Sequence, residues 1–166
     1  EFSERRFAEL MEAGRRKVRD NYHTILIAKN YAGLQEMNAL ISQSSHEDHF
    51  YYKPRITFEE FLALSSNVIK ISACLASPLN RMSINHPMYE RLLRHYDYLE
   101  IQPHNYVDQV DYNRHLAEMS LQYGIPLIAG TDTHSLNKYK AECRTVLQLS
   151  KHIDFADEDT FDLTYK

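Results

Sequence analysis

Apolar positions recur along the chain with two spacings, and these predict an alternation of strands and helices. Short runs dense in apolar and β-branched residues predict strands at residues 22–28, 67–73, 97–102 and 125–130. Helical spacing predicts helices at about residues 3–19, 31–42, 57–64, 87–95, 111–123 and 136–149. This alternation is typical of an α/β fold with parallel strands, and four strands are too few to close a barrel. We therefore expect a partial βα barrel.

Local signals support several of these boundaries. Thr57 and Glu60 have the spacing of a capping box, Pro87 suits the first turn of a helix, and Gly124 suits a helix end. Alternating apolar residues between 161 and 165 indicate one more strand near the C-terminus.

Composition narrows the class of protein. The 166 residues fit one domain, and no apolar run approaches the roughly 20 residues of a membrane span. The net charge of −4 argues against tight DNA binding by this chain alone. Two distant cysteines, Cys74 and Cys143, favour a cytoplasmic location over a disulfide framework, and the spacing of the four glycines excludes the usual phosphate loops.

The predicted strand ends carry the residues best suited to chemistry. Asp132 and His134 follow the last strand, and a spacing of two in extended chain directs both side chains to one side. Cys74 ends the second strand, His23 opens the first, and His104 follows the third. Carboxylate, imidazole and thiolate groups so placed suit a divalent metal that assists the hydrolysis of a phosphoester. Two alternatives remain open: Asp132 and His134 belong to a helix-capping loop, and Cys74 is a buried core residue.

The other candidate positions have simpler interpretations. His46 and His49 lie in a polar loop, where we expect both side chains to be solvated. We interpret Lys53 and Arg55 as cations on the protein surface. Cys143 is expected in the core, because it falls in the middle of a predicted helix.

Several motifs together resemble one family. Residues 22–34, 50–56, 98–104, the Ser-Ala-Cys-Leu run at 72–75 and the Gly-Thr-Asp-Thr-His run at 130–134 resemble the PHP domain of bacterial DNA polymerase III alpha subunits. Their order and spacing match that family over about residues 20–150.

The resemblance implies an incomplete seven-stranded βα barrel that holds up to three metals, usually zinc, manganese or iron. It places His23, Cys74, Asp132 and His134 on ligand positions, with His104 and Glu1 as further candidates. The family's opening His-x-His motif is absent from this sequence. We therefore expect the chain by itself to bind divalent metal weakly or not at all.

The resemblance also implies a function and partners. In the family, this domain is a metal-dependent 3′–5′ exonuclease or a structural platform for the polymerase and a proofreading subunit, with DNA bound through the whole subunit. The runner-up is a fragment of a free-standing phosphoesterase of histidinol-phosphatase type. The third hypothesis is a non-enzymatic structural scaffold whose metal site has decayed. The carboxylates for DNA synthesis lie outside this chain, so we expect it to be inactive alone.

The chain is expected to be a single partial domain over residues 1–166. Glu1 and Phe2 are the pair that a common cloning site encodes, and residues 152–166 are expected to lead toward the polymerase core. Missing strands would leave the strand at 22–28 on an open edge, so we expect self-association there or coverage by the helix at 3–19.

Overall fold

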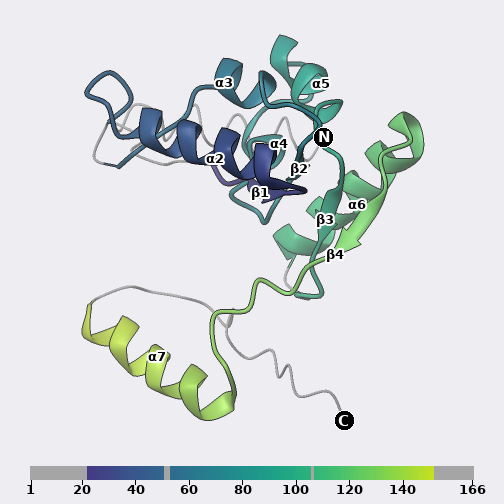
Figure 1. The fold of residues 1–166 in the computed structure, drawn as a ribbon. Helices are drawn as coiled ribbons and strands as arrows, with labels where there is room; N and C mark the ends of the chain where they lie inside the picture. Colours follow the sequence, from purple (N-terminus) through teal and green to yellow (C-terminus); the bar gives the residue numbers. More distant parts are fainter. Residues whose placement is uncertain (1–21, 51–52, 106, 152–166) are drawn as a thin grey trace.

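The computed structural model describes residues 22–50, 53–105 and 107–151 (Figure 1). The described strands are β1 Ile25–Ala28, β2 Val68–Ile71, β3 Leu99–Ile101 and β4 Leu127–Ala129. The described helices are α2 Tyr31–Ser44, α3 Phe58–Leu62, α4 Pro78–Arg81, α5 Pro87–Leu93, α6 Val107–Tyr123 and α7 Lys138–Ser150. The helix expected at residues 3–19 and the strand expected near 161–165 lie outside the described residues.

The predicted mixture of strands and helices is confirmed, with boundaries that follow local chemistry. The side chain of Thr57 accepts from the amide of Glu60, whose carboxylate accepts from the amide of Thr57, so the capping box is present. Pro87 occupies the first turn of α5. After α6 the backbone enters the left-handed region at Gly124, with φ of 69°, which glycine adopts without a steric penalty. The short helix α4 was not predicted.

The first pair of strands corrects the expectation of an all-parallel sheet. β1 and β2 are antiparallel, with Ile25 opposite Ile71 and Ala28 opposite Val68. The connection between them holds two helices, α2 and α3, and not the single helix of a parallel crossover. The connection returns the chain to the end of the sheet where β1 finished, so β2 starts beside the last residue of β1. The backbone amide of Lys29 accordingly donates to the carbonyl of Asn67 at 2.9 Å.

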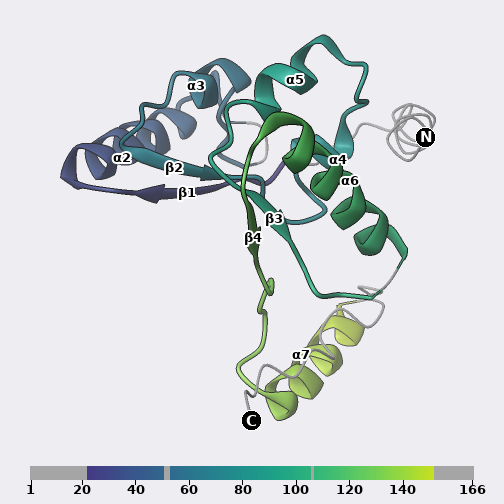
Figure 2. The same ribbon diagram turned by 90° about the vertical axis from the view of Figure 1, so that its right-hand side faces the viewer.

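The second pair of strands has the predicted direction. β3 and β4 are parallel, with Leu99 opposite Leu127 and Ile101 opposite Ala129. A parallel bridge between Ile71 and Tyr98 joins the first pair to the second. Figure 2 shows β1 beside β2 and β3 beside β4, with α6 next to the second pair. The strands in the described part of the chain do not close into a barrel.

The core lies between the sheet and helices α3 to α6. Its fully buried side chains come from β2, α5, β3 and α6, and they are Val68, Leu92, Leu93, Leu99, Tyr112 and Leu116. None of the described helices combines the length and the apolar character that crossing a bilayer requires.

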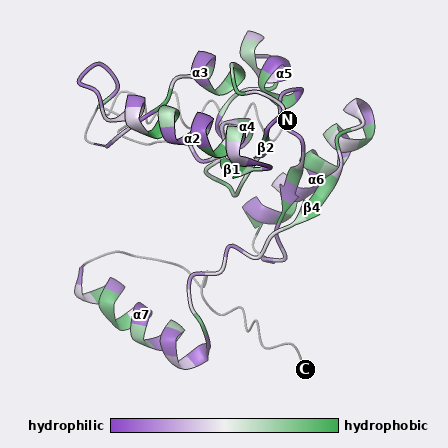
Figure 3. Ribbon diagram, viewed as in Figure 1, coloured by the Kyte–Doolittle hydropathy of each residue, from purple (hydrophilic) through white to green (hydrophobic). Residues whose placement is uncertain are grey.

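Helix α7 stands apart from this core in both ribbon views (Figures 1 and 2). No residue of α7 is buried, and its apolar side chains, including Val146 and Leu149, are exposed. Figure 3 shows that hydrophobic and hydrophilic positions both occur along the α7 ribbon. The prediction that Cys143 lies in the core is therefore wrong, because α7 does not pack on the sheet.

A charged side chain of β2 is buried inside the sheet. Lys70 in β2 is 5% exposed, and its ammonium group donates to the backbone carbonyls of Val68 and Ser65. The carboxylate of Asp97 lies 3.4 Å from the ammonium and also accepts from the backbone amide of Lys70 at 2.8 Å. This pair ties the start of β3 to the middle of β2.

Candidate metal centre

The direction of β1 brings His23 to the rim of the sheet where the other candidates lie. β2, β3 and β4 run the same way, so the residues that follow them share one end of the sheet. Since β1 runs the opposite way, the residue that precedes it reaches that same end. The backbone amide of His23 donates to the carbonyl of Ala76 at 2.9 Å, which fixes His23 beside the turn after β2.

His23 and Cys74 are in contact there. The Nδ1 atom of His23 lies 3.7 Å from Sγ of Cys74, although the two residues are 51 positions apart in the sequence. His23 is exposed and Cys74 is half-buried. Burial raises the pKa of the Cys74 thiol, and the negative charges of Asp132 and Glu100 raise it further.

Backbone strain marks two of the candidate segments. Among the described residues, the only non-glycine residues with positive φ are Ala73, at 62°, and Asp132, at 47°. This region is sterically unfavourable for residues with a side chain, and it recurs at functional sites. Ala73 turns the chain just before Cys74, and Asp132 is itself a candidate ligand.

Asp132 and His134 differ from the extended arrangement that the sequence predicted. Because Asp132 adopts a left-handed conformation, the two side chains are not set by the alternation of a strand. Nδ1 of His134 lies 2.6 Å from the backbone carbonyl oxygen of Asp132 and 3.9 Å from its carboxylate. Both side chains are well exposed, at 48% for His134 and 41% for Asp132. His134 therefore contacts its own loop.

The remaining predicted ligands do not join this group. His104 lies half-buried in the loop after β3, and Glu1 lies outside the described residues. Within residues 22–50, 53–105 and 107–151, no three His, Cys, Asp or Glu side chains converge closely enough to hold a metal ion. Of the predicted ligands, the structure thus brings His23 and Cys74 into contact.

This pair fits a metal by the chemistry of its donors. An imidazole nitrogen and a thiolate sulfur are ligands that zinc and iron favour, whereas magnesium and calcium prefer oxygen. Two such donors, in contact beside the neighbouring strands β1 and β2, would supply two of the ligands that such a metal needs. The carboxylate of Asp132 is a suitable further donor.

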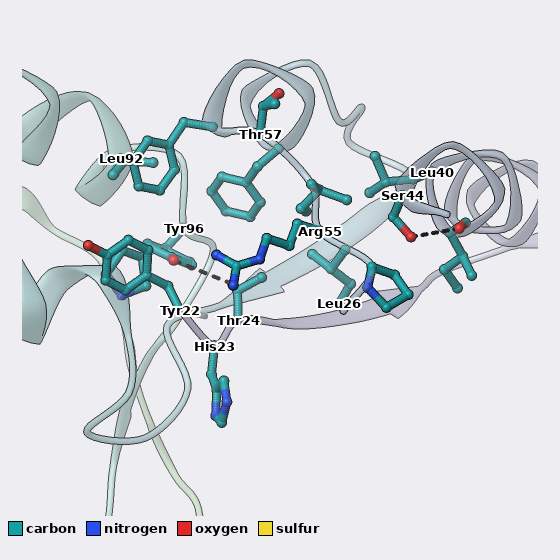
Figure 4. A pocket seen from close by; sticks show the side chains of 16 residues that line it. Tyr22, His23, Thr24, Leu26, Leu40, Ser44, Arg55, Thr57, Leu92 and Tyr96 are labelled. Atoms are coloured by element: carbon teal, nitrogen blue, oxygen red, sulfur yellow. Dashed lines mark hydrogen bonds between the residues drawn. The ribbon is translucent and has the colours of Figure 1, made fainter. Parts of the chain in front are cut away.

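The main cavity of the described residues lies on the other side of His23. Its volume is about 590 Å³, and apolar side chains dominate its lining, among them Leu26, Phe61 and Leu92. Figure 4 shows Arg55, Thr57 and Tyr96 along this cavity, while the His23 ring points away from them. The described lining includes His23 but contains no carboxylate and no cysteine, so of the residues at the candidate metal centre only His23 borders this cavity.

Two side chains were misread or missed from the sequence. His49 is not solvated: its side chain is 11% exposed, and its two ring nitrogens contact Asp48 at 2.8 Å and Glu60 at 2.7 Å. His46 is exposed, as predicted. Glu100 was overlooked, and it is 7% exposed in the middle of β3. The signal that could have found it is an acidic residue flanked by Leu99 and Ile101 in a strand.

Comparison with known proteins supports the resemblance. The family described as the PHP domain matches residues 7–109, a range that includes His23, Cys74 and His104 but ends before Asp132. The DNA polymerase III subunit alpha of Aquifex aeolicus is 36% identical over 136 residues, which cover 76% of this chain and 12% of that protein.

Other relatives show the same pattern. The DNA polymerase III subunit alpha of Borreliella burgdorferi is 30% identical over 136 residues, with 76% of this chain and 12% of the relative covered. The corresponding protein of Deinococcus radiodurans is 27% identical over 150 residues, with 84% and 11% covered. The chain therefore spans only about 11–12% of the length of these relatives.

Proposed function

This chain belongs to the PHP domain family and is homologous to the PHP region of DNA polymerase III alpha subunits, and we propose that it contributes to a divalent-metal site for phosphoester chemistry in such a subunit. The observation that carries the proposal is the contact of 3.7 Å between His23 Nδ1 and Cys74 Sγ. It unites two positions that the family resemblance assigns to metal ligands.

The ligand set combines soft and hard donors. His23, Cys74, Asp132 and His134 would hold the metal, and His104 and Glu1 are further candidates. When bound, the metal supplies a Lewis acid and an activated water for hydrolysis of a phosphoester. Zinc, manganese and iron are the candidates, and the nitrogen and sulfur donors favour zinc or iron.

The chain's own residues prepare this site in two ways. The hydrogen bond from the His23 amide to Ala76 holds the imidazole beside the thiol. Burial and the nearby carboxylates keep the Cys74 thiol protonated until a cation offsets their charge. Metal binding at this site would consequently release a proton.

The surrounding subunit supplies the rest of the function in this proposal. DNA synthesis, contact with DNA and contact with a proofreading subunit would belong to the whole alpha subunit in the bacterial cytoplasm. The polymerase context is preferred over a histidinol-phosphatase-type enzyme because the relatives named above are polymerase subunits.

Cobalt titration tests the metal site, because a cobalt–thiolate bond gives a near-ultraviolet charge-transfer band. We expect a weak band that develops at high cobalt concentration in the wild-type chain and is lost in Cys74→Ser. Cys143→Ser is the matched control, since Cys143 is exposed on α7, away from the sheet, and should keep the band. A band that survives in Cys74→Ser, or no band at millimolar cobalt, would refute the proposal. The second outcome would favour a purely structural domain.

A further inference from the structure

A buried carboxyl group lies next to the candidate metal centre. Glu100 belongs to β3, and its backbone amide donates to Oγ of Ser72 at 2.9 Å. Oε1 of Glu100 accepts from Nε2 of Gln102 at 2.8 Å, and both side chains are almost fully buried. These two hydrogen bonds therefore fix the backbone and the carboxyl group of Glu100 within β3.

Helix α6 anchors this arrangement through amide groups. The Asn113 side chain donates to the carbonyl of Gln102 at 2.6 Å and accepts from its amide at 3.2 Å. Gln109, which is fully buried, donates to the Asn113 oxygen at 2.9 Å. A chain of hydrogen bonds thus runs from α6 through Gln102 to the carboxyl group of Glu100. Such connected networks fix the orientation of a buried polar group.

The carboxyl group also packs over the start of the loop that carries Asp132 and His134. A Cβ atom added to Gly130 would overlap with Oε1 of Glu100. The amide of Gly130 donates to the carbonyl of Ile101 at 2.9 Å, which holds the loop at β3. A side chain at position 130 would have to displace the Glu100 carboxyl group, which fills that space.

The charge of Glu100 has no cationic partner in the part of the chain that the structure describes. No ion pair is formed there between Glu100 and a Lys, Arg or His side chain. A buried carboxylate without a cation is costly, and the Glu100 carboxyl group packs against the start of the loop that carries Asp132. A divalent cation at this rim would offset the negative charges of Glu100 and Asp132.

We propose that Glu100 is a positioning carboxylate of the metal site, which orients the loop at residues 130–134 and supplies outer-sphere negative charge to a divalent cation at His23 and Cys74. The inference rests on the proposed function. It adds a residue that lies outside the ligand set drawn from the family resemblance.

Cobalt titration of matched variants tests the charge of Glu100. Glu100→Gln keeps the shape of the side chain and removes its charge, and we expect cobalt affinity to fall about 10- to 100-fold, as for other outer-sphere partners. The cobalt–thiolate band should remain at saturation, because Cys74 is still present. Glu59→Gln is the control: it makes the same change in net charge at an exposed carboxylate on α3 that pairs with Arg91. Its affinity should match the wild type.

Gly130→Ala tests the packing independently. The added methyl group must displace the Glu100 carboxyl group, so affinity should again fall although no charged residue is changed. A purely structural role for Glu100 would leave affinity unchanged in a folded Glu100→Gln chain. Wild-type affinity in that variant, with the band still lost in Cys74→Ser, would overturn this inference and leave the proposed function standing. Absence of the band in the wild-type chain would overturn both. Should Glu100→Gln fail to fold, wild-type affinity in Gly130→Ala would overturn the inference.

Discussion

The buried pair of Lys70 and Asp97 should show a marked asymmetry between its two partners. Lys70 is 6% exposed at its side chain, whereas Asp97 is 34% exposed. Asp97→Asn leaves a buried ammonium group without its counter-ion. Losing one partner of a fully buried pair costs about 3–5 kcal/mol, and solvent access to Asp97 reduces our expectation to about 1.5–3 kcal/mol. Lys70→Met instead removes the buried charge and keeps the length of the side chain, so we expect a loss of about 1 kcal/mol.

A double-mutant cycle measures this asymmetry. In Lys70→Met the carboxylate of Asp97 keeps solvent and the backbone amide of residue 70 as partners, so adding Asp97→Asn should cost little more. Urea unfolding followed by circular dichroism gives the free energy of unfolding for all four chains. The exposed pair of Glu90 and Arg94 is the control, and Glu90→Gln should cost about 0.3–0.5 kcal/mol. Equal losses for the two single variants, or simple additivity in the double variant, would refute this reasoning.

Three further predictions concern α3, the loop before it and the edge of the sheet. Thr57→Ala removes the capping box of α3 and should lower the free energy of unfolding by about 1 kcal/mol, measured by urea unfolding, whereas an unchanged value would contradict the capping role. Contacts with Asp48 and Glu60 raise the pKa of His49. The protonated His49 side chain therefore contributes its full stabilisation of the folded state below pH 6.5, the ordinary pKa of histidine, and this contribution is lost as the pH rises through the raised pKa. The pKa of Glu60 is lowered, chiefly by the Thr57 amide, so its stabilisation is complete above 4.5 and is lost as pH falls through the lowered pKa. The melting temperature of the wild type should therefore exceed that of His49→Gln by the largest margin between pH 4.5 and 6.5. A margin that grows above pH 6.5 would contradict the raised pKa of His49. Among the described strands β1 pairs only with β2, so its other edge is open, and Ile27 in β1 is 46% exposed. Light scattering should therefore detect self-association that increases with protein concentration, and Ile27→Lys should weaken it. A wild-type chain that stays monomeric at every concentration would count against an open edge.

Local chemistry in the sequence determined the elements themselves. The spacing of apolar residues located all four described strands, and the Thr57–Glu60 pair, Pro87 and Gly124 located helix ends, because caps and turns depend on neighbouring residues alone. Motif order was enough to identify the family, which the comparisons then confirmed. The identities of the candidate ligands also follow from that resemblance.

Only the tertiary structure decided how these elements meet. Strand direction depends on how the long connection through α2 and α3 folds back, so β1 proved antiparallel to β2 where local patterns predicted parallel strands. That reversal is what places His23 against Cys74, a contact between residues 51 positions apart. The exposure of Cys143 and the burial of Lys70, His49 and Glu100 likewise depend on which surfaces pack together. Helical or strand spacing describes one element at a time, whereas burial and charge pairing are properties of two elements in contact.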